Sequence, residues 1–330
     1  MILKLQKNLS RKKIYTVTLI GLGKAGYGNL KNKPSKKSHY YQIKKTKQFK
    51  IEYLFDLDFK NLKKIQNFGS EKKINSYQEL SKINKTDITV ISVPVEKNLE
   101  VIAKLNKFKI LSDFIILEKP VSYNLINFKK IQKILLNKIV MINYQRSWNK
   151  FYDSVLKNKK NLSIYHIYNN GFLNNCSHMI ALLIKYLGKW EKYNLLFKNN
   201  LGDKDPNYSL ILYFKNNNKC ILDGVKNSNL NIFETIIHDG NKIIELKSGA
   251  MSYNERRPKK YSQIEDYFLL SEKNDRIAKI EDNPYFEVEK LIKKFTNSKL
   301  KDLKVDNFPS LPMTRDIISL AENLRNDKKI

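Results

Sequence analysis

The sequence predicts an α/β domain built on a parallel sheet, followed by an α+β domain with an open-faced, mostly antiparallel sheet. Three observations predict this organisation. Short apolar segments alternate with helical patterns as far as residue 145, as in a parallel sheet with crossover helices. The first apolar segment runs straight into the motif Gly21-Leu22-Gly23-Lys24-Ala25-Gly26. Beyond residue 145, strand-like segments follow one another across short turns. We therefore expect two domains, 1–145 and 146–330.

The first domain contains five segments with the composition of strands buried on both faces, being short, apolar and rich in β-branched residues. They are 14–20, 51–56, 87–93, 114–118 and 139–143. Helical patterns lie between them. Ser76 and Glu79 form a capping box, and Ser122 is placed to cap a helix whose apolar residues recur every three or four positions over 125–135. The basic segment 31–38 predicts a surface loop that interrupts the first helix.

The second domain contains strand-like segments at 162–168, 208–215, 219–222, 232–237 and 242–246. The turn residues Asn216-Asn217-Asn218 and Asp239-Gly240-Asn241 predict tight connections between neighbouring strands. Helices are expected at 179–187, from Asn283 onward and around 317–324. Gly188 is a suitable end for the first of these helices. The polar stretch 254–260 predicts an exposed loop.

Composition sets the class of protein. A chain of 330 residues with 42% hydrophobic residues can bury two cores. Its two cysteines, Cys176 and Cys220, form neither a disulfide framework nor a metal-ligand spacing, so we expect no metal and a reducing, cytoplasmic location. No apolar run approaches the ~18 residues that a membrane span requires, so we expect no membrane association.

The net charge of +30 raises the possibility of a nucleic-acid-binding protein. The excess is nearly all lysine, spread along the whole chain, whereas bidentate recognition of phosphates and bases favours clustered arginine. The charge therefore indicates a solvated lysine coat, which would still steer anionic small molecules toward the protein. We expect no nucleic-acid partner.

Three glycines in the pattern G-x-G-x-x-G after a strand permit a tight turn, close approach of the backbone to phosphate, and close packing of helix on strand. Asp56 closes the second strand, where a carboxylate accepts hydrogen bonds from ribose hydroxyls and repels a 2′-phosphate. The pattern thus favours NAD over NADP. Asp58 competes for the same role, and an ordinary turn aspartate is the alternative for Asp56.

Two further motifs stand at the carboxyl ends of predicted strands, where open parallel sheets bind their ligands. Ser92-Val93-Pro94 follows the third strand and Glu118-Lys119-Pro120 follows the fourth. An ammonium placed there, as on Lys119, can hydrogen-bond a substrate hydroxyl and favour its deprotonated form.

The motifs at 21–26, 87–94 and 118–120, in this order, resemble the glucose–fructose oxidoreductase / inositol dehydrogenase / MocA-like (Gfo/Idh/MocA) family. The likeness continues at Asn143-Tyr144-Gln145-Arg146 and at Asn174-Asn175-Cys176-Ser177-His178, and it extends over most of the chain. It implies an NAD(P)-dependent oxidoreductase of sugars, cyclitols or sugar derivatives. It also implies a Rossmann domain joined to an open-faced sheet domain that binds substrate and often forms a dimer interface.

The resemblance also implies roles for single residues. Lys119 would touch both nicotinamide and substrate, His178 would be the acid/base, and Asn174 would orient the substrate hydroxyl. Tyr144 and Arg146 would contact substrate, with a structural salt bridge as the alternative for Arg146. The implied cofactor-binding residues are Gly21, Gly23, Lys24, Ala25, Gly26, Asp56, Val93, Pro94, Asn98, Glu118 and Lys119.

Three positions depart from the family pattern. Asn174 and Ala181 stand where relatives commonly carry aspartate, and Asn98 stands where many carry histidine. We therefore expect an NAD-dependent oxidoreductase moving hydride between a carbinol carbon of a sugar-like substrate and nicotinamide, as a homodimer or homotetramer. The alternative is a catalytically silent regulator or assembly protein of the same fold. Of the other histidines, His39 is expected on a surface helix, and His166 and His238 lie in strands.

Overall fold

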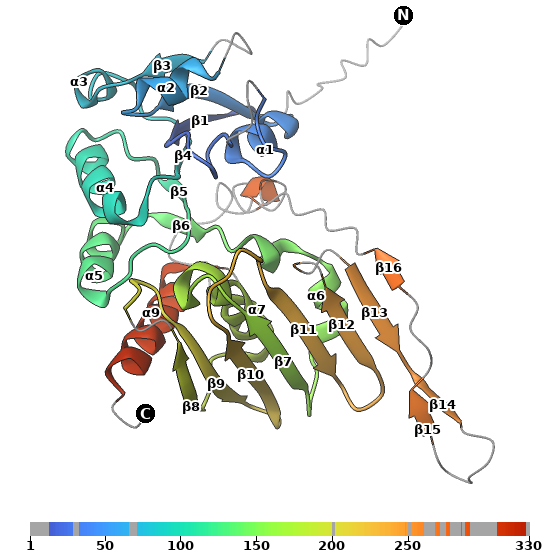
Figure 1. Ribbon diagram of the computed structural model, residues 1–330. Helices are drawn as coiled ribbons and strands as arrows, with labels where there is room; N and C mark the ends of the chain where they lie inside the picture. The colour runs from blue at the N-terminus through green and yellow to red at the C-terminus, as the bar shows by residue number, and fades with distance from the viewer. Residues whose placement is uncertain are drawn as a thin grey trace, which may run out of the picture.

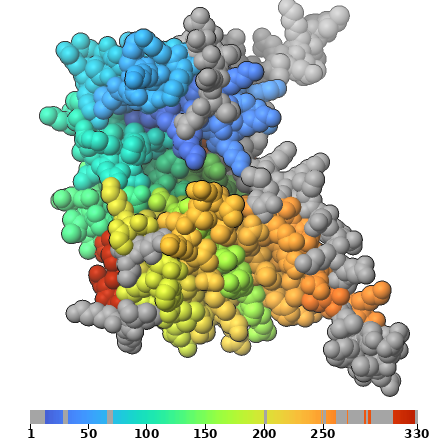
Figure 2. Space-filling view, viewed as in Figure 1, coloured from blue at the N-terminus to red at the C-terminus, as the bar shows by residue number. Residues whose placement is uncertain are grey.

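The computed structural model describes residues 13–28, 33–65, 71–199, 202–247, 249, 252–260, 268–270, 275–277, 285, 288–290 and 309–327. Two lobes lie one against the other (Figures 1 and 2). The N-terminal lobe contains a six-stranded sheet in the order β3-β2-β1-β4-β5-β6, and every neighbouring pair is parallel. Its strands are β1 (Tyr15–Ile20), β2 (Phe49–Phe55), β3 (Lys72–Ile74), β4 (Ile88–Ile91), β5 (Phe114–Leu117) and β6 (Ile139–Ile142). This strand order is that of the dinucleotide-binding Rossmann fold.

Both faces of this sheet are buried, because alternate residues of each strand enter different cores. Ile20 and Phe55 belong to one core, and Leu19 and Leu54 belong to the other. The helices of the lobe are α1 (His39–Lys45), α2 (Phe59–Lys63), α3 (Tyr77–Leu80), α4 (Asn98–Lys107) and α5 (Leu125–Ile134). Tyr285, far away in the sequence, is fully buried in the core that contains β1.

The helix that follows the glycine motif is interrupted, as predicted. One turn forms at 24–27, and helical hydrogen bonding resumes at α1, where His39 N donates to Ala25 O and Tyr40 N to Gly26 O, both at 2.9 Å. In a continuous helix these carbonyls would be bonded by residues four positions later. Helix α1 therefore continues the helical register of the turn at 24–27.

Two predicted caps differ in detail. Ser76 Oγ accepts from Glu79 N at 3.2 Å, as expected, but the Glu79 carboxylate accepts from Asn75 N rather than Ser76 N. The helix assigned to Ser122 is capped instead by Asn124, whose Oδ1 accepts from Asn127 N at 2.9 Å. Ser122 Oγ accepts from Asn124 N and so fixes the turn that precedes the cap.

The second lobe contains an eight-stranded sheet in the order β16-β13-β12-β11-β7-β10-β9-β8. All of its neighbouring pairs are antiparallel except β7 with β10. The strands are β7 (Ser163–Tyr168), β8 (Lys192–Asn199), β9 (Asn207–Phe214), β10 (Asn218–Gly224), β11 (Phe233–His238), β12 (Ile243–Lys247), β13 (Ser252–Arg256) and β16 (Asp275–Ile277). A separate hairpin joins β14 (Pro258–Lys260) to β15 (Phe268–Leu270).

Helices cover one face of this sheet and leave the other open (Figure 1). They are α6 (Phe151–Leu156), α7 (Ser177–Leu187) and α9 (Leu311–Asn326), with a π-helical turn, Phe172–Cys176, leading into α7. On the open face Tyr165 and Ile236 are 37% and 43% exposed. The predicted fold class, a parallel α/β domain joined to an open-faced, mostly antiparallel sheet domain, is confirmed.

Two features of the second lobe were predicted wrongly or missed. The stretch 254–260 is not a loop, because it supplies most of β13 and all of β14. Strand β8 went unpredicted, since half of its residues are exposed and it lacks a continuous apolar run. The helix expected from Asn283 lies largely outside the described residues. Its described residues, 285 and 288–290, are helical, and Tyr285 and Val288 are buried. Within the described part of the chain, no helix is long and apolar enough to cross a membrane.

Candidate functional site

The glycine motif forms a loop between β1 and the turn at 24–27. A Cβ atom on Gly21 would lie 2.3 Å from Ser92 O, and one on Gly26 would lie 1.9 Å from Gly21 O. Internal packing therefore explains the first and third glycines. Gly23 is different, because no atom of the described residues lies within 4 Å of the position that its Cβ would take. The second glycine leaves open space on the outer side of the loop.

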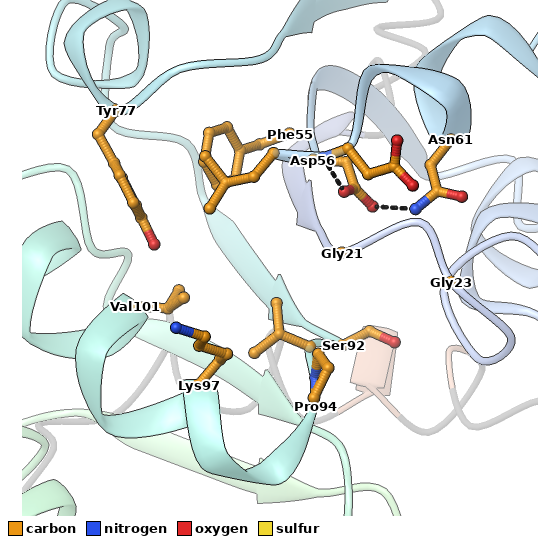
Figure 3. A pocket seen from close by; sticks show the side chains of 13 residues that line it. Gly21, Gly23, Phe55, Asp56, Asn61, Tyr77, Ser92, Pro94, Lys97 and Val101 are labelled. Atoms are coloured by element: carbon orange, nitrogen blue, oxygen red, sulfur yellow. Dashed lines mark hydrogen bonds between the residues drawn. The ribbon is translucent and has the colours of Figure 1, made fainter.

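Asp56 ties the end of β2 to this loop. Its Oδ2 accepts from Leu22 N at 2.7 Å and from Asn61 Nδ2 at 3.1 Å, and its Oδ1 accepts from Asp58 N at 2.8 Å. A carboxylate offers about four acceptor positions, so one remains for a ligand. Asp58, the competing candidate, instead caps α2 by accepting from Lys60 N. Figure 3 shows the hydrogen bonds of Asp56 with Asn61 and Asp58.

A cavity of about 350 Å³ lies between the ends of β1, β2 and β4. This volume falls within the range of small-molecule sites. Figure 3 shows the Tyr77 ring beside that of Phe55, with Val101 and Lys97 below them. The lining residues are Gly21, Gly23, Phe55, Asp56, Leu57, Asp58, Asn61, Tyr77, Ser92, Val93, Pro94, Lys97 and Val101. The structure thus brings together five predicted cofactor residues: Gly21, Gly23, Asp56, Val93 and Pro94.

Asp58 and Ser92 had also been named from the sequence, but Leu57, Asn61, Tyr77, Lys97 and Val101 were missed. Tyr77 comes from α3, and Lys97 and Val101 come from the start of α4, so they converge only when the crossovers fold. Asn61 could have been predicted from the sequence, because it lies on α2, the short helix that follows Asp56 and is capped by Asp58. Lys24 and Ala25 are exposed on the glycine loop beside this cavity.

Glu118 is held by side chains from two distant parts of the chain, and a third part supports one of them. Its Oε1 lies 2.7 Å from His39 Nε2 and accepts from Asn143 Nδ2 at 2.5 Å. His39 Nδ1 in turn lies 2.7 Å from the Tyr285 hydroxyl. The expectation that His39 lies on the surface is therefore wrong, since it is 2% exposed. Hydrogen bonding to His39 and Asn143 lowers the pKa of Glu118 against the opposing effect of burial, so the carboxylate stays ionised.

Lys119 reaches from the Rossmann lobe to the second lobe. Its Nζ donates to Asn174 O at 2.5 Å, in the π-helical turn that leads into α7. Burial lowers the pKa of Lys119, while the charges of Glu118 and Asp205 oppose this shift. The structure therefore brings Lys119 together with the segment that carries His178, as the sequence predicted.

His178 lies in the first turn of α7, four residues beyond Asn174. Its ring meets the Tyr144 ring edge-on, with centroids 6.0 Å apart. Its Nδ1 is buried without a hydrogen-bond partner among the described residues. Burial and the positive charges of Lys119 and Arg146 lower the pKa of His178 well below its ordinary value, so the imidazole is neutral at physiological pH.

Asn98 and Tyr144 do not lie as predicted. Asn98 was expected to bind cofactor, but it is 1% exposed and its Nδ2 donates to Val121 O at 3.0 Å. Tyr144 was expected to contact substrate, yet it is 1% exposed and its hydroxyl lies 3.4 Å from Thr314 Oγ1. Both side chains support neighbouring segments: Asn98 holds the loop after Lys119, and Tyr144 packs against His178.

Arg146 occupies a structural position. Its Nη1 donates to Gly249 O at 2.5 Å, and its guanidinium lies 3.6 Å from the centre of the Phe233 ring. Arg146 therefore joins the end of the Rossmann lobe to the second sheet. This is a structural role, as in the alternative considered for Arg146, although these two contacts are with a carbonyl oxygen and an aromatic ring rather than a carboxylate. Of the remaining histidines, His166 is buried with Nδ1 2.9 Å from Thr235 Oγ1, and His238 is exposed.

Comparisons with known proteins address the family and the fold. Residues 15–144 match the model of an oxidoreductase family with an NAD-binding Rossmann fold, Gfo/Idh/MocA. No curated protein matches the sequence. The fold resembles that of an oxidoreductase from Thermotoga maritima, with 15% identity, a TM-score of 0.69, and coverage of 95% of this chain and 96% of that one.

Two other solved structures with a similar fold are an oxidoreductase and a repressor protein. An oxidoreductase from Agrobacterium radiobacter, solved with NAD+, L-tartaric acid and magnesium, has 14% identity, a TM-score of 0.59, and coverage of 93% and 94%. A super-repressor mutant of Gal80p from Saccharomyces cerevisiae has 16% identity, a TM-score of 0.69, and coverage of 94% and 95%. At these identities the likeness establishes the fold and nothing finer. Over residues 15–144, the match to the NAD-binding Rossmann domain of the Gfo/Idh/MocA oxidoreductases confirms the resemblance seen in the motifs.

Proposed function

We propose that this protein is an NAD-dependent oxidoreductase acting on a CH–OH group of a sugar or sugar derivative, in which Lys119 and His178 assist proton transfer. One observation carries the proposal. The Lys119 ammonium is hydrogen-bonded to the backbone of Asn174, so a cation from one lobe meets the segment of the other lobe that presents a neutral histidine. An acid and a base placed together in this way suit alcohol–carbonyl chemistry.

The glycine loop and the cavity fit a dinucleotide. Gly23 leaves open space where a diphosphate approaches a Rossmann loop, and the amides of Gly23, Lys24 and Ala25 bond to none of the described residues. Asp56 retains an acceptor position for a ribose hydroxyl, while its charge and that of Asp58 disfavour a 2′-phosphate. We therefore propose NAD rather than NADP. A bound nicotinamide would exchange hydride with the substrate carbon.

The chain's own residues would handle the proton. In the oxidative direction, a substrate hydroxyl would donate a hydrogen bond to the His178 imidazole, whose lowered pKa keeps it able to accept the proton. The Lys119 ammonium would stabilise the negative charge that develops on the substrate oxygen. Asn174 would orient the hydroxyl, since its amide side chain is partly exposed beside Lys119.

The test is Lys119→Met, with exposed Lys107→Met on α4 as the matched control. Turnover would be followed by NADH absorbance over a panel of sugars, sugar acids and nucleotide sugars. We expect Lys119→Met to lose ~10²-fold or more of kcat, the usual contribution of such a group. NADH binding and cooperative thermal unfolding should both be retained, as in the control. Unchanged turnover on an active substrate would refute the role of Lys119.

A regulator of the same fold is the second candidate. Asn174 and Ala181 favour it, because neither supplies the negative charge that would raise the basicity of His178. Gal80p of Kluyveromyces lactis, a transcriptional regulator, has a similar fold, so this fold is not confined to oxidoreductases. NADH binding without turnover on any member of the panel would favour this candidate over the enzyme.

We also propose that the open face of the second sheet joins two copies of the chain. The exposed apolar side chains of Tyr165 and Ile236 lie side by side on this face, as neighbours across β7 and β11. Ile236→Glu should convert a dimer or tetramer into monomers in light scattering, whereas exposed Leu136→Glu on the Rossmann lobe should not. A wild-type monomer at high concentration would refute the proposal.

A further inference from the structure

Asp205 is a buried carboxylate that the scheme above does not use. It lies in the connection between β8 and β9 and is 7% exposed. Its Oδ1 accepts from Leu173 N at 2.8 Å, and its Oδ2 accepts from Asn174 N at 2.7 Å. Asp205 thus bonds both amides at the start of the segment that leads to His178.

Gly171 makes room for this carboxylate. Its φ of +96° lies in the region that favours glycine, and a Cβ atom there would lie 2.1 Å from Asp205 Oδ2. Asn207 Oδ1 accepts from Gly171 N at 2.8 Å and fixes the turn from its other side. Any larger residue at 171 would displace the carboxylate, so the local sequence is built around Asp205.

Asn174 connects Asp205 to Lys119. The carboxylate holds the Asn174 amide nitrogen, and the Lys119 ammonium bonds to the Asn174 carbonyl oxygen. The position of the ammonium therefore depends on a backbone segment that Asp205 fixes. Asn174 itself brings no charge, and its Nδ2 faces the Tyr123 hydroxyl at 3.5 Å.

The charges of Asp205 and Lys119 also act on each other. Asp205 opposes the effect of burial on the pKa of Lys119, second only to Glu118. Burial raises the pKa of Asp205 to about 6, against the two backbone amides and Lys119, so the carboxylate is ionised at pH 7 and above. The titratable groups that act on Asp205 are Lys119, Tyr123, Tyr168, Cys176, Tyr208 and Arg325. Only Lys119 and Arg325 among them are charged at neutral pH.

We propose that Asp205 is the positioning residue and counter-ion of Lys119, supplying from the β8–β9 connection the negative charge that Asn174 does not carry. The catalytic consequence rests on the proposed function. The effect of Asp205 on Lys119 does not, because it would exist equally in a protein without turnover.

The first experiment measures the protonation of Lys119 by competitive acetylation and mass spectrometry from about pH 6 to about pH 11. The variants are Asp205→Asn and the control Asp203→Asn, which changes an exposed carboxylate in the same connection. Asp205→Asn should lower the titration midpoint of Lys119 by about one pH unit, because an opposite charge nearby is lost. Asp203→Asn should not move it, and Asn174→Asp in the Asp205→Asn background should restore it.

A reciprocal measurement avoids dependence on a variant that removes a backbone hydrogen bond. In Lys119→Met, the Asp205 midpoint, followed by ¹³C NMR of the carboxyl carbon, should rise by a similar amount, since coupling between two sites is mutual. Unmoved midpoints in both measurements would overturn the proposal. Where a substrate is known, Asp205→Asn should also move the basic limb of the kcat profile to lower pH. Shifted midpoints without turnover on any substrate would sink the enzymatic function and leave the role of Asp205 standing.

Discussion

His39 Nε2 lies 2.7 Å from Glu118 Oε1, so the residue at which the first helix resumes holds the carboxylate that precedes Lys119. The interruption before α1 leaves this helix in contact with the site through His39. Helix α1 continues the helical register of the turn at 24–27, and His39 enters the core below the ends of β5 and β6. The base of the site is thus built from His39 in the first crossover, from Glu118 and Asn143 directly after β5 and β6, and from Tyr285.

His39→Ala should destabilise the fold by ~1–3 kcal/mol, because it leaves Glu118 and the Tyr285 hydroxyl with one hydrogen-bond partner fewer in a buried place. Urea unfolding would measure the loss. His238→Ala, at an exposed position of β11, is the control and should change the free energy of unfolding by less than ~0.5 kcal/mol. Equal effects of the two substitutions would show that the His39 contacts contribute nothing.

Gly23→Ala and Gly26→Ala should fail in different ways. A methyl group on Gly26 would meet the Gly21 carbonyl at 1.9 Å, so this variant should lose stability by ~1–3 kcal/mol or more. Gly23 has open space and no positive φ, so Gly23→Ala should unfold like wild type. It should nevertheless bind NADH at least ~10-fold more weakly, because the methyl group occupies the side where a diphosphate approaches. Thermal unfolding and NADH fluorescence titration separate the two effects, and intact NADH binding by Gly23→Ala would contradict the assignment.

Asp56→Asn should relax the preference between the two nicotinamide cofactors. The substitution keeps an oxygen able to accept a hydrogen bond but removes the charge that repels a 2′-phosphate. We expect the ratio of the Kd values for NADPH and NADH to fall by ~10-fold, or ~1.4 kcal/mol. Asp58→Asn should have a smaller effect, since the Asp58 side chain is occupied in capping α2. A wild-type protein that binds NADPH more tightly would refute the cofactor proposal.

His166 should make stability fall at low pH. Burial and the charge of Arg146 lower its pKa to about 3, from 6.5. Below pH 6.5 the unfolded chain binds a proton at this residue and the folded chain does not. The free energy of unfolding therefore decreases as the pH falls, by up to ~1.4 kcal/mol per pH unit from this group. In His166→Gln the slope between pH 6 and pH 4 should be shallower by about that amount, whereas His238→Gln should retain the wild-type slope. Parallel slopes in all three proteins would show that His166 does not titrate on unfolding.

Local signals in the sequence were sufficient for the glycine loop and the strand ends. Gly21, Gly26 and Asp56 follow apolar strands directly, so their places at the carboxyl edge of a parallel sheet depend only on the sheet itself. The non-helical segment 33–38, the described part of the predicted loop, was also predictable, because charge and proline break a helical pattern locally. The segment 254–260 was not, since its charged side chains pair along β13, as in Glu255 with Lys242 and Arg257, and such pairing is invisible in a one-dimensional pattern.

Side-chain direction was beyond the sequence. Asn98 and Tyr144 lie close to the predicted site in the chain, yet both point into the protein, toward Val121 and Thr314. His39 and Asp205 carried no motif, and each became part of the site through partners more than 30 residues away. Contacts of this kind arise only when separate crossovers and both lobes close on one another.

By itself, the sequence determined that a parallel sheet would present a glycine loop, an acid and Lys119 along one edge, because strand pattern and turn chemistry are local. Only the tertiary structure decided what surrounds Lys119, because the Asn174 carbonyl and the charge of Asp205 come from the second lobe. Burial then set which of these groups carry charge, since the cost of desolvation depends on everything packed around them.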